Sequence, residues 1–468
     1  MTAALIEHLR THLGPAQVLT EGDLSAWELD WRRRWRGKAL AVVRPGNTAE
    51  VAAVVQACAA GGVSIVPQGG NTGLVGGGVP DTSGSQVLLS LQRMHQIRAI
   101  DAANLTMTVD AGCVLQTVQQ TAHDAGLLFP LSLAAEGSCT IGGNLATNAG
   151  GTQVLRWGNA RDLCLGLEVV TAQGDVWEGL SGLRKDNTGY DLRDLFIGSE
   201  GTLGIITAAT LKLAPQPAAS TTALAGCATL DNCVALLALA QRRLGAGLTG
   251  FEVMGRVALN LVARHFPALP RPLPGAPWTV LLELSDTDSE ATARGRFETL
   301  LGDALEAGTV QDAVVAESIA QAQALWHLRE SIPLAQAEEG LNIKHDISLP
   351  VSRIPAFCHH TDALLERHFP GVRLVNFGHL GDGNLHYNVQ APAGADGARF
   401  LADHEHAVNT LVFDALLPHG GSFSAEHGIG QLKRDELAAR KSPVALQLMR
   451  AIKAALDPQG LMNPGRVL

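Results

Sequence analysis

The chain has 468 residues, of which 46% are hydrophobic and 17% charged, which excludes a disordered protein and suggests two or three domains. A formal net charge of −10 and only 4% aromatic residues argue against nucleic-acid binding, which needs basic patches or stacking rings. The seven cysteines include no CxxC pair and no spacing typical of a zinc knuckle or an iron–sulfur cluster, and this pattern favours a reducing compartment.

The first fourteen residues have the pattern of an amphipathic helix. Glu7, His8 and Arg10 lie inside the apolar pattern, so a signal peptide is not predicted. The uncharged stretch 137–155 is rich in Gly, Asn and Thr, and we predict no membrane span there. We expect a cytoplasmic protein.

The region up to residue 214 alternates short apolar runs with glycine-rich loops. A helix is predicted over 48–60, with Thr48 as its N-cap and Gly61-Gly62 at its end. Strands are predicted at 42–43, 64–66, 87–89 and 107–109. The alternation indicates an α/β or α+β unit, and the proline-containing stretch 214–217 is the predicted linker to the next domain.

Long helices alternate with β-rich segments from about 218 to 420, and the tail from residue 424 is predicted to be mainly helical. Residues 245–250 match GxGxxG, but they follow a helical pattern at 233–244 and precede an extended one. A dinucleotide fingerprint needs the strand first and the helix second. We interpret this segment as a helix end and turn, which argues against a nicotinamide-dependent dehydrogenase.

Glycine-rich loops in the first region are candidates for binding a phosphate group. The loops span 67–74, 137–151 and 198–205. Glycines allow the backbone to approach a phosphate, and successive N–H groups form an anion-binding nest. A turn that binds nothing would explain any single loop, but three such loops in one region favour a cofactor site.

A polar cluster is predicted in the second region. Two strands, 373–379 and 384–390, are joined by a Gly-Asp-Gly-Asn turn. Alternation places Leu385, Tyr387 and Val389 on a core face and His386, Asn388 and Gln390 on a polar face. His379 flanks the same turn and is near enough to share a cation with His386.

Two histidines and one carboxylate form a common catalytic zinc set. Glu426 is the natural carboxylate, and His427 beside it is a candidate base. Histidines satisfied by hydrogen bonds are the alternative, and the spacing alone leaves both interpretations open.

Two cations in this region are candidates for binding an anionic substrate. Arg329 lies on a helix predicted from about residue 317, and Lys344 lies on the polar side of a predicted strand, opposite Ile347. A solvated surface charge is the alternative for both residues. An Arg suits carboxylate binding because its planar fork makes two parallel hydrogen bonds.

These motifs together resemble a known family. The segments PQGGNTGL, GSCTIGGNLATNAGG and IGSEGTLGI resemble the FAD-binding domain of the vanillyl-alcohol oxidase / p-cresol methylhydroxylase (PCMH) superfamily. The segments GHLGDGNLH, AEHGIG and NPGR resemble its D-2-hydroxyglutarate and D-lactate dehydrogenase branch. The resemblance covers nearly the whole chain. It implies a two-domain α+β fold: a PCMH-type FAD-binding domain at 1–214, an antiparallel-sheet cap domain at 215–423, and a helical segment at 424–468 that returns to the first domain.

The resemblance also implies roles for individual residues. FAD would be held non-covalently, because the first loop contains no His for attachment. A divalent metal, usually zinc, would be bound by His379, His386 and Glu426, and the substrate by Arg329, Lys344, Asn388 and His427, the last as the catalytic base. The cofactor-binding residues would be Pro67, Gly69, Gly70, Asn71, Thr72, Gly73, Leu74, Gly137, Ser138, Gly142, Asn144, Thr147, Asn148, Glu200, Gly201, Ile206 and Asn463.

The predicted activity is the oxidation of a D-2-hydroxy acid to the 2-oxo acid, by hydride transfer to flavin N5. D-2-hydroxyglutarate is the first candidate, because two cations are more than a small monocarboxylate needs and unpaired buried cations are costly. Pro333 stands where the 2-hydroxyglutarate enzymes carry a Thr, which removes a hydroxyl contact and is expected to end or bend the helix.

D-lactate or glycolate oxidation is the same-class alternative. A metal-dependent hydrolase and a flavoprotein subunit that only passes electrons are the others. The resemblance implies an electron acceptor such as an electron-transfer flavoprotein, and we allow for a homodimer.

Overall fold

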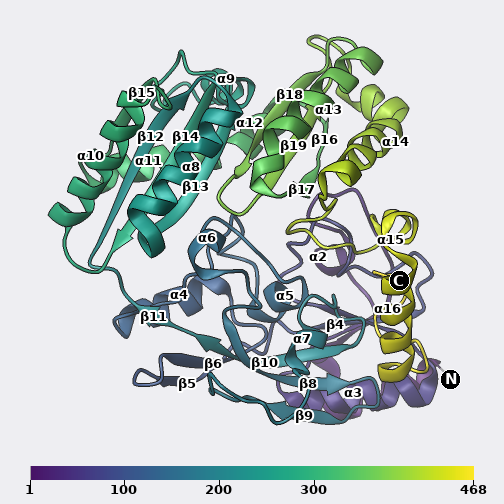
Figure 1. The fold of residues 1–468 in the computed structure, drawn as a ribbon. Helices are drawn as coiled ribbons and strands as arrows, with labels where there is room; N and C mark the ends of the chain where they lie inside the picture. Colours follow the sequence, from purple (N-terminus) through teal and green to yellow (C-terminus); the bar gives the residue numbers. More distant parts are fainter. Residues whose placement is uncertain (1) are drawn as a thin grey trace. The chain divides into compact units, whose positions relative to one another are not determined.

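The computed structural model describes residues 2–468, which form two compact units (Figure 1). The first unit contains the residues up to Gly150, Gly158–Gln216 and Glu426–Leu468. The second unit contains Gly151–Trp157 and Pro217–Ala425. The chain therefore enters the second unit twice, once through a seven-residue excursion that includes helix α6 (Val154–Trp157). No helix within residues 2–468 combines the length and the apolar composition that a membrane crossing requires.

The first unit contains a small sheet that carries the first glycine loop. Its strand order is β1-β2-β4-β3, with β4 parallel to both β2 and β3. The strands are β1 (Val18–Leu19), β2 (Ala39–Val43), β3 (Ile65–Gln68) and β4 (Gln86–Ser90). Helix α1 (Thr2–Leu13) buries Leu5, Ile6, Leu9 and Leu13, which confirms the predicted amphipathic helix.

A second, antiparallel sheet in this unit has the order β5-β6-β10-β8-β9. Its strands are β5 (Ile97–Asp101), β6 (Thr106–Asp110), β8 (Cys164–Thr171), β9 (Val176–Gly179) and β10 (Gly204–Lys212). The predicted linker is partly structured, because β11 (Ala214–Pro215) pairs with β7 (Leu127–Leu128). Further α-helices of this unit are α2 (Ser25–Glu28), α4 (Leu115–Asp124), α5 (Ile141–Ala146), α7 (Arg193–Phe196), α15 (Arg434–Arg440) and α16 (Pro443–Leu456).

Helix α3 (Thr48–Gly61) begins where the sequence predicts it, but its N-cap is Asn47 and the prediction of Thr48 was wrong. The Asn47 side chain accepts a hydrogen bond from the Glu50 amide at 2.9 Å. This bond satisfies one of the amide donors that every helix leaves unpaired at its start. The Thr48 hydroxyl instead donates to Glu168 Oε1.

The second unit is built on an eight-stranded antiparallel sheet, as the family resemblance implies. Its order is β15-β12-β14-β13-β18-β19-β16, and β17 also pairs with β19. The strands are β12 (Ala219–Cys227), β13 (Leu248–Gly255), β14 (Trp278–Asp286), β15 (Asp312–Val315), β16 (Asn342–Ile343), β17 (Asp346–Ser348), β18 (Arg373–His379) and β19 (Asn384–Gln390). The last two have the predicted bounds.

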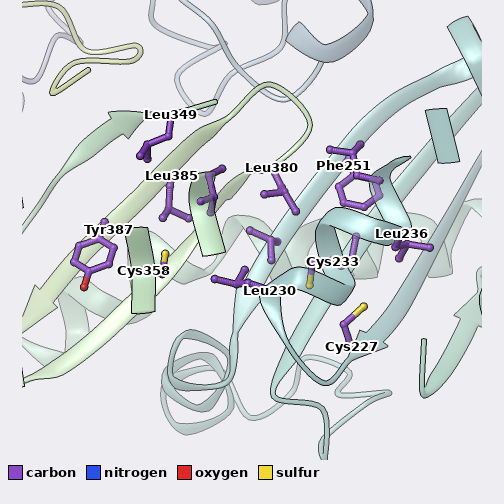
Figure 2. Close-up of a cluster of buried hydrophobic side chains, with 14 of the residues drawn as sticks. Cys227, Leu230, Cys233, Leu236, Phe251, Leu349, Cys358, Leu380, Leu385 and Tyr387 are labelled. Atoms are coloured by element: carbon purple, nitrogen blue, oxygen red, sulfur yellow. The ribbon is translucent and has the colours of Figure 1, made fainter. Parts of the chain in front are cut away.

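One face of this sheet packs on the larger apolar core of the unit. Phe251, Leu385 and Tyr387 point from the strands toward helix residues such as Leu236 and Cys358 (Figure 2). The covering helices are α8 (Leu230–Leu244), α10 (Glu290–Glu306), α13 (Ile354–His368) and α14 (Gly397–Leu416).

The opposite face is covered by α9 (Arg256–His265), α11 (Ile319–Glu330) and α12 (Ile332–Glu339), which form a smaller apolar cluster with Met254, Leu281 and Phe377. Period-2 alternation therefore assigns His386 and Asn388 to this second face, as predicted.

Two local predictions are confirmed in this unit. The GxGxxG segment forms the end of α8, a 3-10 turn (Gly245–Gly247) and the start of β13. Helix follows strand in a dinucleotide fingerprint, and here the order is reversed. Pro333 is the second residue of α12, so the preceding helix ends at Glu330 as expected of a proline.

Candidate active site

The glycine loops converge on one pocket inside the first unit. Its space, counted with its opening to solvent, is about 1020 Å³, which is large enough for a cofactor. The pocket also includes His427. Its lining contains these predicted cofactor residues: Pro67, Gly69, Gly70, Asn71, Thr72, Gly73, Gly142, Asn144, Thr147, Glu200, Gly201 and Ile206.

Close packing explains the glycines at the base of this pocket. A Cβ atom at Gly69 would clash with the Thr140 hydroxyl, and one at Gly70 would clash with the Ser138 carbonyl oxygen. The first loop therefore lies directly against the second loop, and any larger side chain would separate them. Among the described residues, no atom lies within 4 Å of a Cβ atom built at Gly73, so not every glycine of the first loop is required by close packing.

The pocket has unmet hydrogen-bonding groups that fit FAD. Within residues 2–468, none of the backbone N–H groups of residues 69–73 donates to a protein acceptor. Such a run of amides suits the pyrophosphate of a dinucleotide. Buried side-chain oxygens at Gln68 and Thr140, both in the lining, also lack a partner among the described residues. Buried polar groups are normally paired, so these atoms indicate a polar ligand.

Glu200 holds the segment that carries His427. Its carboxylate accepts the Ile429 amide at 2.7 Å and the Gly430 amide at 2.8 Å. Burial raises the pKa of Glu200, although the two amide hydrogen bonds act to lower it. Because Gln431 also donates to the Gly76 carbonyl, the segment 429–431 is fixed to the wall of the pocket and His427 with it.

Some predicted cofactor residues lie outside the pocket lining: Leu74, Gly137, Ser138, Asn148 and Asn463. Asn148 accepts the Arg161 amide at 3.0 Å. Asn463 donates to the carbonyl oxygens of Gly77 and Glu200, and its own buried oxygen has no partner in the part of the chain that the structure describes. These contacts give both residues a role in shaping the loops.

Part of the lining was not predicted from the sequence. Asp30 and the run Gly76-Gly77-Gly78 belong to the pocket. The three successive glycines two residues after the first loop could have been predicted as part of the cofactor pocket. No local sequence pattern indicates a role for Asp30.

In the second unit, strand pairing brings the predicted polar residues together on one face of the sheet. Across β18 and β19, His386 lies opposite Phe377, and across β13 and β18, Glu252 lies opposite His379. The rings of His379 and His386 have centroids 5.4 Å apart and an edge-on arrangement. This spacing supports the prediction that the two histidines can share a cation.

Glu252 contacts both His379 and Arg329 on this face, and it was not predicted from the sequence. Its Oε1 contacts His379 Nδ1 at 2.6 Å, and its Oε2 accepts from Arg329 Nε at 2.8 Å. Burial alone would raise the pKa of Glu252, but the charges and hydrogen bonds of His379 and Arg329 lower it to about 2. A lone carboxylate in the apolar run GFEVMG was the signal that could have revealed it.

Arg329 is buried, with 7% of its side chain exposed. Its guanidinium carbon lies 5.1 Å from the centre of the Phe377 ring. Of the three guanidinium nitrogens of Arg329, only Nε donates to an acceptor within residues 2–468. The prediction that Arg329 is an unpaired cation was therefore wrong, because Glu252 neutralises it. The two Nη groups of Arg329 remain available for a ligand.

The segment around Lys344 differs from the prediction of one continuous strand. The strand is interrupted at Lys344-His345, between β16 and β17, and Lys344 is exposed. The interruption buries His345, whose ring nitrogens contact the Tyr387 carbonyl at 2.8 Å and Asn409 Oδ1 at 2.9 Å. His345 is therefore buried although it flanks the exposed Lys344, and the alternation of the strand is lost here. Because Tyr387 and Asn409 are distant in the sequence, the pattern around Lys344 does not reveal this.

Asn388 is buried on the polar face and is held from two sides. Its oxygen accepts the His345 amide at 3.1 Å, and its amide group donates to Gln336 Oε1 at 2.9 Å. Gln336 belongs to α12, which covers this face. Asn388 therefore lies on the same face as His386, as predicted, with its amide orientation fixed by the protein.

Glu426 follows the last residue of the second unit. The Ala425 amide donates to the Asp346 carbonyl at 3.3 Å, and Asp346 lies opposite His386 across β17 and β19. The chain thus leaves this unit beside His386. Within the first unit, a Cβ atom at Gly150 would approach Glu426 Oε1 to 2.7 Å, so a glycine at this position leaves space for the carboxylate.

The chemistry of these groups fits a divalent metal. Glu252 engages Nδ1 of His379, which leaves Nε2 as the nitrogen that can bind a metal. Histidine ligands of metals usually donate their second nitrogen to a carboxylate in this way. Two imidazoles and one carboxylate form a donor set that zinc accepts while keeping a position open.

Comparison with known proteins identifies the family. Residues 39–179 match the FAD binding domain family, and residues 216–467 match the family described as FAD linked oxidases, C-terminal domain. The chain is 42% identical over 470 residues to D-2-hydroxyglutarate dehydrogenase of Xanthomonas citri pv. viticola, covering 100% of this chain and 97% of that protein. It is 40% identical over 456 residues to the mitochondrial D-2-hydroxyglutarate dehydrogenase of Bos taurus, covering 97% of this chain and 81% of the relative.

The chain belongs to the D-2-hydroxyglutarate dehydrogenase family of FAD-linked oxidases. Its fold is similar to that of p-cresol methylhydroxylase, with a TM-score of 0.76 at 18% identity over 99% of this chain and 96% of the other. This likeness confirms the predicted PCMH-type two-domain fold. As a member of the D-2-hydroxyglutarate dehydrogenase family, the protein is an FAD-dependent oxidoreductase, and the interpretation as a metal-dependent hydrolase was wrong.

Proposed function

We propose that this member of the D-2-hydroxyglutarate dehydrogenase family oxidises D-2-hydroxyglutarate to the 2-oxo acid and depends on a divalent metal, zinc. The similarity to D-2-hydroxyglutarate dehydrogenases, which extends over nearly the whole chain, supports this substrate. The observation that carries the proposal is the buried Arg329 guanidinium, whose Nη groups meet no acceptor within residues 2–468. The two Nη groups are not among the fully buried atoms that lack a partner, so a ligand can reach them, and a carboxylate matches their fork geometry.

The binding roles follow from the polar face of the second unit. Arg329 would bind a substrate carboxylate through its two Nη groups, and Asn388, whose orientation is fixed by Gln336, would contact the substrate from the same face. Lys344 is exposed, so it would add a charge at the border of the site. Because a long-chain Lys can reach an anion without being buried, this position is compatible with the proposed role.

The metal would be held by His379, His386 and Glu426. A divalent cation at these residues would supply Lewis-acid polarisation of the 2-hydroxy acid. His379 would bind through Nε2, because Glu252 holds Nδ1. His386 would bind from β19, the strand next to β18. Glu426, which directly follows the last residue of the second unit, would supply the carboxylate.

His427 would act as the catalytic base. It lies in the lining of the glycine-loop pocket, in the segment that Glu200 anchors. Its imidazole would accept the proton of the substrate 2-hydroxyl, a contribution typically worth about 10²–10⁴-fold. FAD, when bound, supplies the two-electron oxidation of the substrate carbon. The amides of residues 69–73 and the crowded loop contact at Gly69 and Gly70 would hold its pyrophosphate.

Reoxidation of the flavin requires an external acceptor, and we propose an electron-transfer flavoprotein for this role. D-lactate and glycolate are the alternative substrates, because Pro333 at the start of α12 offers no hydroxyl to a second carboxylate. A panel of D-2-hydroxy acids separates these possibilities.

The decisive experiment is anaerobic mixing of the purified holoenzyme with each acid. D-2-hydroxyglutarate should bleach the flavin absorbance, and its kcat/KM with an artificial acceptor should exceed those of D-lactate and glycolate. Bleaching by D-lactate with the larger kcat/KM would replace the proposed substrate. A lack of bleaching with any acid of the panel would contradict the proposed chemistry.

A further inference from the structure

One buried carboxylate contacts two different parts of the proposed substrate site. Glu252 has 1% of its side chain exposed and lies in the middle of β13. Its two oxygens are divided between two partners: Oε1 contacts His379 Nδ1 at 2.6 Å and Oε2 accepts from Arg329 Nε at 2.8 Å. His379 comes from the neighbouring strand β18, and Arg329 from α11 on the same face of the sheet.

Each contact fixes the orientation of its partner. The bond to Nδ1 assigns the proton of His379 to that nitrogen and directs Nε2 away from Glu252. The bond to Nε fixes the plane of the Arg329 guanidinium and leaves Nη1 and Nη2 unused by the protein within residues 2–468. A side chain that only filled space would not need to bond two different residues through its two oxygens. An apolar residue would fill the same volume without the cost of burying a charge.

A second buried carboxylate on the same face provides a comparison. Glu283 on the adjacent strand β14 accepts hydrogen bonds from Trp326 Nε1 at 2.8 Å and Thr249 Oγ1 at 3.0 Å. Both partners are neutral, and neither is a proposed ligand of the metal or the substrate. Burial raises the pKa of Glu283, although these hydrogen bonds act to lower it. The sheet can therefore hold a buried carboxylate without joining it to the proposed site.

We propose that Glu252 is a positioning residue that orients His379 for the metal and Arg329 for the substrate carboxylate at the same time. This inference rests on the proposed function, because it takes His379 as a metal ligand. It has a consequence that neither contact alone would have. A single substitution at Glu252 weakens metal binding through His379 and substrate binding through Arg329, and the two effects are measured separately.

The test uses Glu252→Gln with Glu283→Gln as the matched control. Gln keeps the shape of Glu but offers a single acceptor oxygen, so it cannot serve both donors. Zinc affinity of the metal-depleted, FAD-loaded protein is measured by competition with a chelator. Glu252→Gln should lower this affinity about 10- to 100-fold, the usual effect of removing a carboxylate that orients a ligating His. Glu283→Gln should leave the zinc affinity within about threefold of wild type, since neither of its partners is a ligand.

The second measurement is the steady-state response to D-2-hydroxyglutarate at saturating zinc. Glu252→Gln should raise KM by a larger factor than it lowers kcat, because the loss at Arg329 is one of substrate orientation. Glu283→Gln should change KM and kcat little. A purely structural role for Glu252 would lower the active fraction, which reduces apparent kcat and leaves KM and the zinc affinity of the remaining protein unchanged.

A third comparison keeps the inference testable if Glu252→Gln does not fold. The double variant Glu252→Met/Arg329→Met removes both buried charges together and is compared with Arg329→Met alone. Zinc affinity should be about 10- to 100-fold lower in the double variant, because only there does His379 lose its acceptor. Equal zinc affinities in the two proteins, or in Glu252→Gln and wild type, would overturn the inference alone. A wild-type protein that binds no zinc would overturn the proposed metal centre and the inference together.

Discussion

Replacing Arg329 with Met should change which acid the enzyme prefers. In the proposed site, the two Nη groups of Arg329 bind the distal carboxylate of D-2-hydroxyglutarate, which D-lactate lacks. The variant should therefore lose kcat/KM for the dicarboxylate and keep most of it for lactate. The two groups meet no other acceptor within residues 2–468, so a bound carboxylate would be their only strong partner.

The size of the effect follows from the number of hydrogen bonds that are lost. Two bonds to a charged group, each worth about 1.5–3 kcal/mol, amount to about 3–6 kcal/mol. At about 1.4 kcal/mol per factor of ten, the kcat/KM ratio of D-2-hydroxyglutarate to D-lactate should fall about 10²- to 10⁴-fold. Arg329→Lys should show a smaller fall, because it keeps the charge but lacks the planar fork.

Stability has to be separated from selectivity in this assay. Arg329→Met leaves Glu252 buried next to His379 without its second charged partner, and breaking a buried ion pair costs about 3–5 kcal/mol. A lower Tm is therefore expected. Both substrates are measured on the same preparation, well below its Tm, so that the fraction of folded enzyme cancels from the ratio. Equal losses for both acids would refute the reasoning, because Arg329 would then bind the carboxylate that the two acids share.

Further predictions concern the cofactor, the metal and the base. Acid precipitation should release FAD into the supernatant, since the loop 67–74 contains no His for covalent attachment; flavin retained in the pellet would show a covalent link. His386→Ala or Glu426→Ala should reduce metal content and turnover in parallel while the spectrum of bound flavin persists, whereas full turnover after chelation would contradict a catalytic metal. His427→Ala should keep FAD and metal but lose about 10²-fold or more in kcat, and a loss of metal would identify His427 as a ligand instead.

The sequence by itself determined the features that depend on local patterns. Alternation over 373–379 and 384–390 was sufficient to predict both strands with their bounds and to place His386 opposite the core face, because the side-chain period of a strand is a property of the backbone. The order of helix and strand around 245–250 was likewise readable. Glycine loops marked the cofactor pocket, because close backbone approach leaves few other choices of residue.

Tertiary structure decided the pairings between distant residues. Glu252 and His379 are 127 positions apart, and they meet because β13 and β18 are neighbours in a register that the sequence does not state. At the interruption, the amide and ring nitrogens of His345 contact oxygens of Asn388, Tyr387 and Asn409, and no pattern within 342–348 contains these partners. The charge on Arg329 was visible in the sequence, whereas its neutralisation by Glu252 was not, because an ion pair is a property of the fold that brings its two members together.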